Sequence, residues 1–153
     1  MQTIIITGSC GLVGSESVNF FHNKGFRVIG IDNNLRQKFF GKDGSTKWIK
    51  NIIIRKNKNY IHNNIDIRDK KSMEKIFKKY QKNLKLIIHC AAQPSHDYAK
   101  NNSKIDFEVN ATGTHNLLEL TKKYSPSSPF IFMSTNKVYG DNSNKLKFLK
   151  KKE

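Results

Sequence analysis

The sequence has little of what marks a secreted, membrane-spanning or metal-binding protein. Its two cysteines, Cys10 and Cys90, are too few for a disulfide framework, and neither lies at a CxxC or other metal-ligand spacing. No apolar run reaches about 18 residues, and the first residues carry no charged segment followed by an apolar one. We therefore expect a cytoplasmic protein with no disulfide, no bound metal and no membrane partner.

Acidic side chains are also scarce, with 12 Asp and Glu against 28 Lys and Arg, a net charge of +16 and a pI near 9.9. Such an excess of positive charge is common in nucleic-acid-binding proteins. The basic residues, however, gather at 70–85 and 145–152 and not in a recognised nucleic-acid-binding motif. This distribution is typical of a solvated helix face and a basic tail, so we expect no nucleic-acid partner and rank nucleic-acid binding as the last alternative.

What the sequence does contain is a regular alternation of apolar segments within the length of one domain, 153 residues. Short apolar runs rich in β-branched residues predict strands at 2–7, 27–32, 86–90 and 129–134, and 60–67 is predicted to be a further strand and its exit. Apolar residues at helical spacing predict helices that end near 24 and that cover 70–82 and 104–124. Strands separated by helices in this way predict an α/β fold with a doubly wound parallel sheet of Rossmann type and about five strands.

Two stretches are less regular than the rest. Residues 35–56 are expected to form a short helix or an irregular segment in which Trp48 and the isoleucines at 52–54 pack against the body of the protein. Residues 141–153 are rich in lysine and are expected to form a mobile tail that follows a single folded domain at 1–140.

Three glycines, Gly8, Gly11 and Gly14, stand between the first predicted strand and the helix that follows it. Glycines in such a turn let the backbone approach a pyrophosphate closely, and the N-terminus of the helix attracts the negative charge of the phosphates. Their GxxGxxG spacing differs from the GxGxxG of the dinucleotide-binding fingerprint. An ordinary tight turn is therefore the alternative interpretation.

Asp32 ends the second predicted strand, 18 residues after Gly14. A carboxylate at this position accepts hydrogen bonds from the adenosine ribose hydroxyls and repels a 2′-phosphate, which favours NAD over NADP. The nearby Arg36 leaves NADP open as a second possibility. A role in forming a turn or capping a helix is the alternative for Asp32.

Several motifs occur in one order along residues 2–146, namely the glycine turn at 7–14, Asp32, and the segments 64–69, 89–93, 109–114 and 134–141. Together they resemble the extended short-chain dehydrogenase/reductase family, the NAD-dependent epimerases and dehydratases of nucleotide sugars. The segments 91–99 and 134–141 look most like its CDP-paratose 2-epimerase branch. The 4-epimerases and 4,6-dehydratases of other nucleotide sugars are the alternative within the family.

The resemblance implies NAD as cofactor and a nucleotide sugar, with a CDP-sugar favoured, as substrate. In this family a sugar hydroxyl is transiently oxidised by NAD, a tyrosinate acts as base, and a Ser or Thr hydroxyl holds the reacting oxygen. By resemblance Thr135 takes that last role, with Ser134 as the less favoured neighbour. The cofactor would be bound by Gly8, Cys10, Gly11, Leu12, Val13, Gly14, Asp32, Asn33, Asp66, Ile67, Ala91, Ala92, Gln93 and Asn110.

Each of these roles has a structural alternative. Asp66 is of a type that caps turns, Ala91 and Ala92 would let a helix approach the sheet, and Asn110 would suit a buried hydrogen bond. Thr135 and Ser134 would serve equally as ordinary hydroxyls at the end of a strand.

The sequence does not contain the tyrosine–lysine pair that the resemblance calls for. None of the five tyrosines is followed four residues later by a lysine. By resemblance, we expect the C-terminal part of the family fold to be missing. We expect the chain alone to be inactive and its fifth strand to lie at a sheet edge with exposed apolar side chains. It would be a truncated enzyme or the N-terminal part of a split one whose other half is separately encoded. A non-enzymatic NAD-binding module is the alternative.

Overall fold

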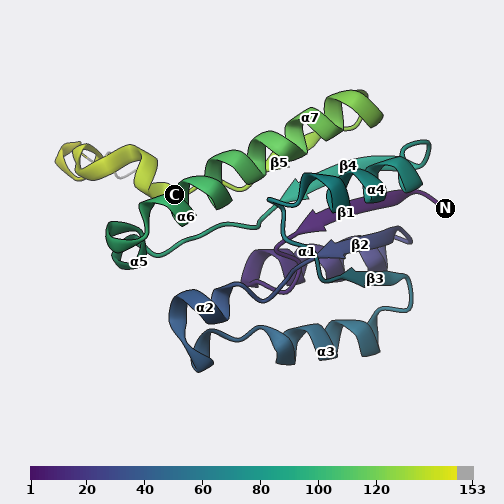
Figure 1. Cartoon of the computed structure of the whole chain (residues 1–153), viewed down its shortest axis with the longest axis horizontal. Helices are drawn as coiled ribbons and strands as arrows, with labels where there is room; N and C mark the ends of the chain where they lie inside the picture. Colours follow the sequence, from purple (N-terminus) through teal and green to yellow (C-terminus); the bar gives the residue numbers. More distant parts are fainter. Residues whose placement is uncertain (148–153) are drawn as a thin grey trace, which may run out of the picture.

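A computed structural model describes residues 1–147 of the chain. Five strands form one parallel sheet in the order β3-β2-β1-β4-β5 (Figure 1). Their bounds are Thr3–Thr7 for β1, Arg27–Ile31 for β2, Tyr60–Asn63 for β3, Leu84–His89 for β4 and Phe130–Phe132 for β5. The doubly wound parallel sheet of five strands is therefore confirmed. The predicted tail at 141–153 falls partly on residues 148–153, which lie outside the described residues.

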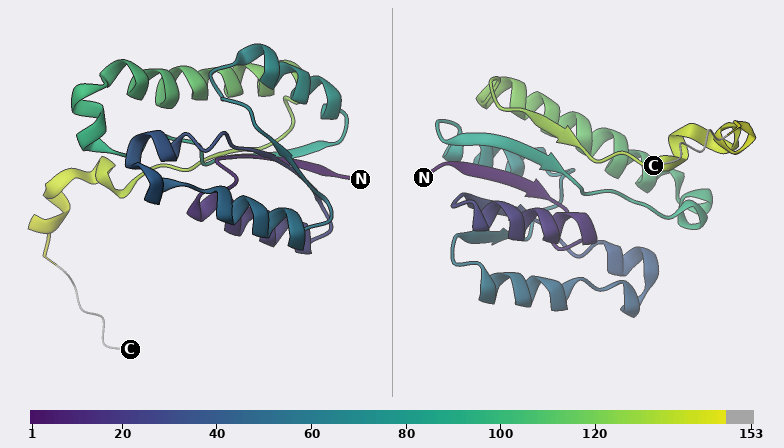
Figure 2. Two further views of the ribbon diagram at one scale, coloured as in Figure 1. Left: turned by 60° about the horizontal axis from the view of Figure 1, so that its bottom comes forward. Right: turned by 180° about the vertical axis from the view of Figure 1, so that it is seen from behind.

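Helices cover both faces of the sheet (Figure 2). One face packs against α1 and α3 and the other against α4 and α7, with bounds Leu12–Asn23, Lys47–Lys56, Lys70–Tyr80 and Thr114–Tyr124 respectively. Within β1, Ile5 points to the α4/α7 face, whereas Ile4 and Ile6 point to the α1/α3 face. Because both faces of a parallel strand are buried, an unbroken apolar run is what such a strand requires.

The segment 60–67 is the third strand and its exit, as predicted, and β3 itself ends at Asn63. Asp66 turns the chain soon afterwards, because its Oδ1 accepts a hydrogen bond from the backbone nitrogen of Arg68 at 2.9 Å. The Asp66 carbonyl oxygen also accepts from the nitrogen of Asp69 at 2.9 Å, and Asp69 then caps α4 through Ser72. Local side-chain hydrogen bonds of this kind compete with strand pairing.

The helix predicted at 104–124 is continuous but not α-helical throughout. It begins as α6 (Ser103–Phe107), passes through a π-helical turn η2 (Glu108–Gly113) and continues as α7. At Gly113 a Cβ would lie 2.5 Å from the Ile67 side chain, so the helix approaches the chain after β3 very closely there. Such π-helical turns are frequent at functional sites, and this one lies beside the cavity described below.

The segment between β2 and β3 is helical but packs less than predicted. It consists of α2 (Arg36–Phe40), the short turn η1 (Lys42–Gly44) and α3. Ile53 of α3 is buried, whereas Trp48 is 63% exposed and both Ile52 and Ile54 are exposed. The expectation that Trp48 packs was wrong, because α3 buries the side that carries Ile53 and Trp48 lies on its exposed side.

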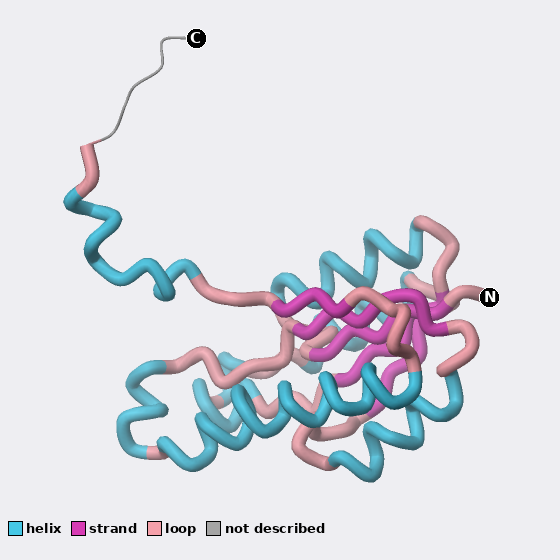
Figure 3. The backbone as a smooth tube through the Cα atoms, turned by 90° about the horizontal axis from the view of Figure 1, so that it is seen from above, coloured by secondary structure: helices cyan, strands magenta, loops and turns pink. Residues whose placement is uncertain are grey.

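The last described strand lies at an edge of the sheet, as predicted. β5 pairs only with β4, and Ile131, Phe132 and Met133 are 43%, 54% and 41% exposed. The turn η3 (Asn136–Lys145) then leads away from the sheet (Figure 3). A further short helix that was not predicted, α5 (His96–Asn101), follows β4. Among residues 1–147, no helix is both long and apolar enough to cross a membrane.

Candidate functional site

A cavity of about 680 Å³ opens at the carboxyl ends of the strands. Its walls come from the segments that follow each of the five strands and from the helix containing η2. The strand order places β1 between β2 and β4. Strands β2 and β3 are added on one side of β1 and strands β4 and β5 on the other, so β1 and β4 flank the topological switch point. Open α/β sheets bind their ligands in the crevice at such a switch point, and the volume suits a small organic molecule.

The glycine turn lines the cavity, and there is no room for a side chain at two of its glycines. Gly8 has φ +63°, and a Cβ there would lie 2.7 Å from the nitrogen of Ala91. A Cβ on Gly14 would lie 2.1 Å from the Gly8 carbonyl oxygen. The close approach of Gly8 to Gly14 brings the start of α1 directly against the end of β1.

The N-terminus of α1 faces the same cavity, since Leu12 and Val13 line it. Gly11, the residue before the helix, has no side chain that could cap the first backbone N–H groups. Uncapped N–H groups and the helix dipole together attract an anionic ligand group. The turn and the helix thus have the shape and the charge that a pyrophosphate needs.

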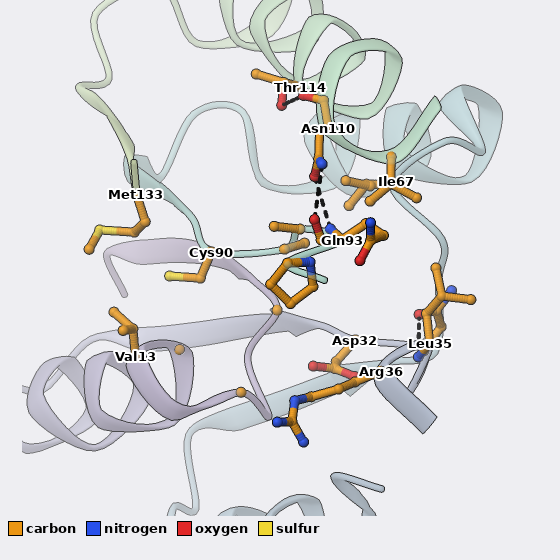
Figure 4. A pocket seen from close by; sticks show the side chains of 18 of the residues that line it. Val13, Asp32, Leu35, Arg36, Ile67, Cys90, Gln93, Asn110, Thr114 and Met133 are labelled. Carbon is orange, nitrogen blue, oxygen red and sulfur yellow. Dashed lines mark hydrogen bonds between the residues drawn. The ribbon is translucent and has the colours of Figure 1, made fainter. Parts of the chain in front are cut away.

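Asp32 follows β2 at one end of the cavity (Figure 4). Its Oδ2 accepts a hydrogen bond from the nitrogen of Cys10 at 3.0 Å, and its Oδ1 accepts from the nitrogen of Asn34 at 2.8 Å. Each carboxylate oxygen can accept a second hydrogen bond, so Asp32 can tie the glycine turn to β2 and still accept from a ligand hydroxyl.

Arg36 lies near Asp32 and lines the same cavity (Figure 4). Its Nη1 donates to the Gly44 carbonyl oxygen at 3.3 Å, and its Cζ stands 4.7 Å from the centroid of the Phe40 ring. A guanidinium group has five N–H donors, so these two contacts still leave it able to meet a phosphate group on the ribose.

Asp66 and Ile67 line the cavity on the segment that follows β3, beside Asn33. The Asp66 carboxylate accepts from Arg68 Nη2 at 2.7 Å and from Asn33 Nδ2 at 3.1 Å. Burial by itself would raise the pKa of Asp66, but the hydrogen bonds and positive charge of Arg68 outweigh it and lower the pKa below its usual 3.8. Asp66 is therefore an ionised residue that both caps a turn and lines the cavity.

Asn110 and Gln93 join the helix containing η2 to the segment after β4. Asn110 Oδ1 accepts from the nitrogen of Gln93 at 2.9 Å, and its Nδ2 donates to the Gln93 carbonyl oxygen at 3.0 Å. The Gln93 side chain in turn donates to Asp106 Oδ1 at 2.8 Å and accepts from the nitrogen of Ser95 at 2.6 Å. These bonds fix the segment that contains Ala91 and Ala92, which also line the cavity.

A buried histidine of β4, His89, connects β4 to β1 and α7 next to the cavity. His89 Nδ1 is 2.7 Å from Thr7 Oγ1, and its Nε2 is 2.8 Å from Thr114 Oγ1. Thr114 donates to the Asn110 carbonyl oxygen at 2.7 Å, and Thr7 accepts from the nitrogen of Ala91 at 3.2 Å. With these directions assigned, His89 is neutral with its proton on Nε2. Burial lowers the pKa of His89 to about 4, which agrees with the neutral form.

Ser134 and Thr135 also line the cavity and directly follow Met133, which lies at the same end as Val13 and Cys90 (Figure 4). Both follow β5, and both are exposed. Burial raises the pKa of Cys90 to about 11, so its thiol stays protonated and unreactive at neutral pH. Within residues 1–147 no group of three or more His, Cys, Asp or Glu side chains could hold a metal ion.

The structure gathers the residues that the sequence singled out around this one cavity, with one exception. Those that line it are Gly8, Gly11, Leu12, Val13, Gly14, Asp32, Asn33, Asp66, Ile67, Ala91, Ala92, Gln93, Asn110, Ser134 and Thr135. Cys10 does not line it, because its side chain is buried below the turn and only its backbone is directed toward Asp32. Residues that were not predicted include Leu35, Thr114 and Met133. Leu35 lies only three residues after Asp32, so its position offered a signal.

Comparisons with known proteins agree with this geometry. The profile of the GDP-mannose 4,6 dehydratase family matches residues 5–150. The CDP-paratose 2-epimerase of Salmonella typhi is 34% identical over 138 residues, which are 90% of this chain and 38% of the relative. The chain therefore spans less than half the length of that relative.

Two solved structures share both fold and sequence with the chain. The UDP-glucose 4-epimerase of Thermotoga maritima, solved with UDP-glucose, has a TM-score of 0.74 and 30% identity over 92% of this chain and 40% of that one. The UDP-glucose 4-epimerase of Thermus thermophilus, solved with NAD, has a TM-score of 0.69 and 27% identity over 88% of this chain and 38% of that one.

Proposed function

The chain belongs to the NAD-dependent nucleotide-sugar epimerase and dehydratase family, and from this we propose that its cavity binds NAD for the transient oxidation of a nucleotide sugar. The observation that carries the proposal is the arrangement at the switch point of the sheet. A glycine turn without room for side chains faces an uncapped helix N-terminus, and the Asp32 carboxylate stands at the end of the neighbouring strand. These groups match the pyrophosphate and the ribose of a dinucleotide.

Calorimetric titration of the 153-residue chain with NAD tests the cofactor directly. We expect saturable binding of one NAD per chain, and weaker binding of NADP. Asp32 supports the preference for NAD because it would repel a 2′-phosphate, whereas Arg36, which lines the same cavity, would attract one and make the preference smaller. A chain that binds neither dinucleotide would contradict the proposal.

Replacing Asp32 by alanine is expected to reduce the preference for NAD over NADP roughly tenfold, since a hydrogen bond to a charged group and a repulsion are lost together. The ratio of the two dissociation constants is the measurement. Asp32 also accepts from the Cys10 and Asn34 nitrogens, so damage to the turn would weaken both dinucleotides alike. An unchanged ratio would therefore show that Asp32 does not select the cofactor.

For the chemical step we propose that Thr135 holds the reacting sugar oxygen, with Ser134 beside it. When bound, NAD accepts a hydride from the sugar carbon and later returns it. The proton of the sugar hydroxyl needs a base, and no tyrosine of the chain has a lysine four residues later. We propose that a separately encoded polypeptide supplies the tyrosine and lysine, and that the substrate is a CDP-sugar, as the name of the Salmonella relative suggests.

Turnover of CDP-paratose measures this part of the proposal. The chain with NAD alone is expected to be roughly 10²–10⁴-fold slower than the complete site, or slower still, because general acid–base catalysis is absent. Adding the C-terminal part of the Salmonella typhi relative is expected to restore turnover, and a Thr135→Ala chain in that mixture should remain slow. Turnover by the chain alone would contradict the proposal, and turnover of UDP-glucose in place of CDP-paratose would favour a 4-epimerase.

A non-enzymatic NAD-binding module is the second candidate. It is supported by the fact that the dinucleotide end of the cavity is assembled within the described residues. Tight NAD binding without turnover, even after the C-terminal part of the relative is added, would favour it.

A further inference from the structure

Tyr60, a tyrosine on the edge strand β3, contacts the glycine turn from the side of the core. Tyr60 stands on β3 opposite Val28 of β2, yet its hydroxyl lies over Gly30, two residues nearer the cavity. A Cβ on Gly30 would lie 2.2 Å from Tyr60 Oη, so the tyrosine occupies the space that a side chain at position 30 would need. Tyr60 is only 7% exposed, and its ring belongs to the core between the sheet and α1 and α3.

The Tyr60 hydroxyl connects the turn to β3 through hydrogen bonds. Its Oη is 2.9 Å from Ser9 Oγ and 3.0 Å from His62 Nδ1. Ser9 is fully buried and Cys10 is 1% exposed, so neither can use water as an alternative partner. Ser9 can donate to Tyr60, and Tyr60 can donate to a neutral His62. Burial raises the pKa of Tyr60, which keeps its hydroxyl protonated.

The turn has few other attachments at these residues. Gly8 and Ser9 donate their backbone N–H groups to the Ile31 carbonyl oxygen at 2.8 and 3.4 Å, and the Cys10 N–H donates to the Asp32 carboxylate at 3.0 Å. These bonds join the backbone of the turn to the end of β2. Within the described residues, the Ser9 hydroxyl has one other partner besides Tyr60, the Cys10 sulfur at 3.9 Å, which is a weak one.

We propose that Tyr60 is a positioning residue for the dinucleotide site, which holds the glycine turn in its binding conformation through Ser9. This inference rests on the function proposed above. If the buried Ser9 hydroxyl loses its partner, the glycine turn is favoured to rearrange so that the hydroxyl finds another. The apparent affinity for the ligand then falls in proportion to the fraction of molecules whose turn keeps the binding conformation. Tyr60 would thus act on the cofactor without touching it.

Amide hydrogen exchange of the chain without NAD tests the effect on the turn. The probes are the amides of Cys10 and Gly11, which are bonded to Asp32 and to the Gly8 carbonyl oxygen, and Ile87 of β4 is the reference. Tyr60→Phe and Ser9→Ala are each expected to speed exchange at the probes roughly tenfold or more while Ile87 is unchanged. The double variant should not exceed the faster single variant, since both remove one interaction.

Tyr80→Phe is the matched control. Tyr80 is 6% exposed and lies in the core on the opposite face of the sheet, so the same chemical change there should leave the probes at the wild-type rate. Probe amides that keep the wild-type rate in Ser9→Ala, or that speed up only together with Ile87, would overturn the proposal. Ser9→Ala decides the matter even if Tyr60→Phe does not fold.

Titration with NAD then separates this inference from the proposed function. If the wild-type chain binds NAD, Tyr60→Phe and Ser9→Ala should raise the dissociation constant about five- to tenfold and Tyr80→Phe less than about twofold. Affinities equal to the wild-type value would overturn the positioning role. If the wild-type chain does not bind NAD, the proposed cofactor function fails, and the exchange rates of Cys10 and Gly11 still decide whether Tyr60 orders the turn.

Discussion

Replacing Gly14 by alanine is expected to lower the affinity for NAD roughly a hundredfold or more. The added Cβ would lie 2.1 Å from the Gly8 carbonyl oxygen and 2.8 Å from its carbon, and both atoms belong to the backbone. Gly8 cannot shift toward Ala91 to make room, because the two residues are already packed closely. A Cβ on Gly8 would lie 2.7 Å from the Ala91 nitrogen. The start of α1 must therefore move away from β1, and the N–H groups that would meet the pyrophosphate move with it.

The same substitution is expected to destabilise the fold by about 1–3 kcal/mol, the usual cost of inserting a methyl group into a filled site. Calorimetry gives the affinity and denaturant titration gives the free energy of unfolding. Gly25→Ala is the control at the other end of α1. Gly25 has φ +83° but nothing within 4 Å of a Cβ, so alanine there should cost about 1 kcal/mol and leave NAD affinity unchanged. A Gly14→Ala chain that binds NAD within about tenfold of wild type would contradict the steric argument.

The sheet and its switch point were predictable because the physical causes are local in the sequence. The isoleucines of β1 can only be a strand buried on both faces, and the glycines that follow mark the turn into α1. Asp32 could be assigned to the cavity because the carboxyl ends of neighbouring parallel strands meet at one edge of a sheet. Order along the chain was sufficient for these assignments.

The support beneath the site was not predictable from the same information. Thr7, His89 and Thr114 contact one another although they lie far apart in the chain, and no spacing rule joins them. The π-helical turn that contains Asn110 also depends on tertiary contacts, since Gly113 packs against Ile67. Periodicity predicts a helix there but cannot reveal where one extra residue enters it.

The hydroxyl of Tyr60 illustrates the same limit within one strand. Alternation of side chains predicts that Tyr60 points to a sheet face, and it does lie in the core beside α1 and α3. Its reach along β2 to the glycine turn depends on the absence of a side chain at Gly30, the neighbour in the sheet. Only the register between β2 and β3 brings these two residues together.

Lowering the pH from about 6.5 to about 4 is expected to destabilise the chain by about 3 kcal/mol through His89 alone. Burial lowers the pKa of folded His89 to about 4 from its ordinary 6.5, so only the unfolded chain binds a proton between these values. The unfolded state is therefore favoured increasingly as the pH falls through this window. Well below pH 4 His89 is protonated in both states and no longer changes the free energy of unfolding. The magnitude follows because one pKa unit corresponds to about 1.4 kcal/mol.

Protonation of His89 would also reverse a hydrogen bond. Its Nδ1 accepts from the Thr7 hydroxyl, which itself accepts from the Ala91 nitrogen, so a proton on Nδ1 would leave the Thr7 O–H group without its acceptor. Denaturant titrations across about pH 4–7 measure the loss, and NMR titration of the imidazole gives its pKa directly. His89→Gln should abolish most of this pH dependence, whereas His62→Gln should retain it, since burial lowers the pKa of the half-buried His62 less. An imidazole of folded His89 that titrates near 6.5 would show that the Thr7–His89–Thr114 connection does not hold the neutral form.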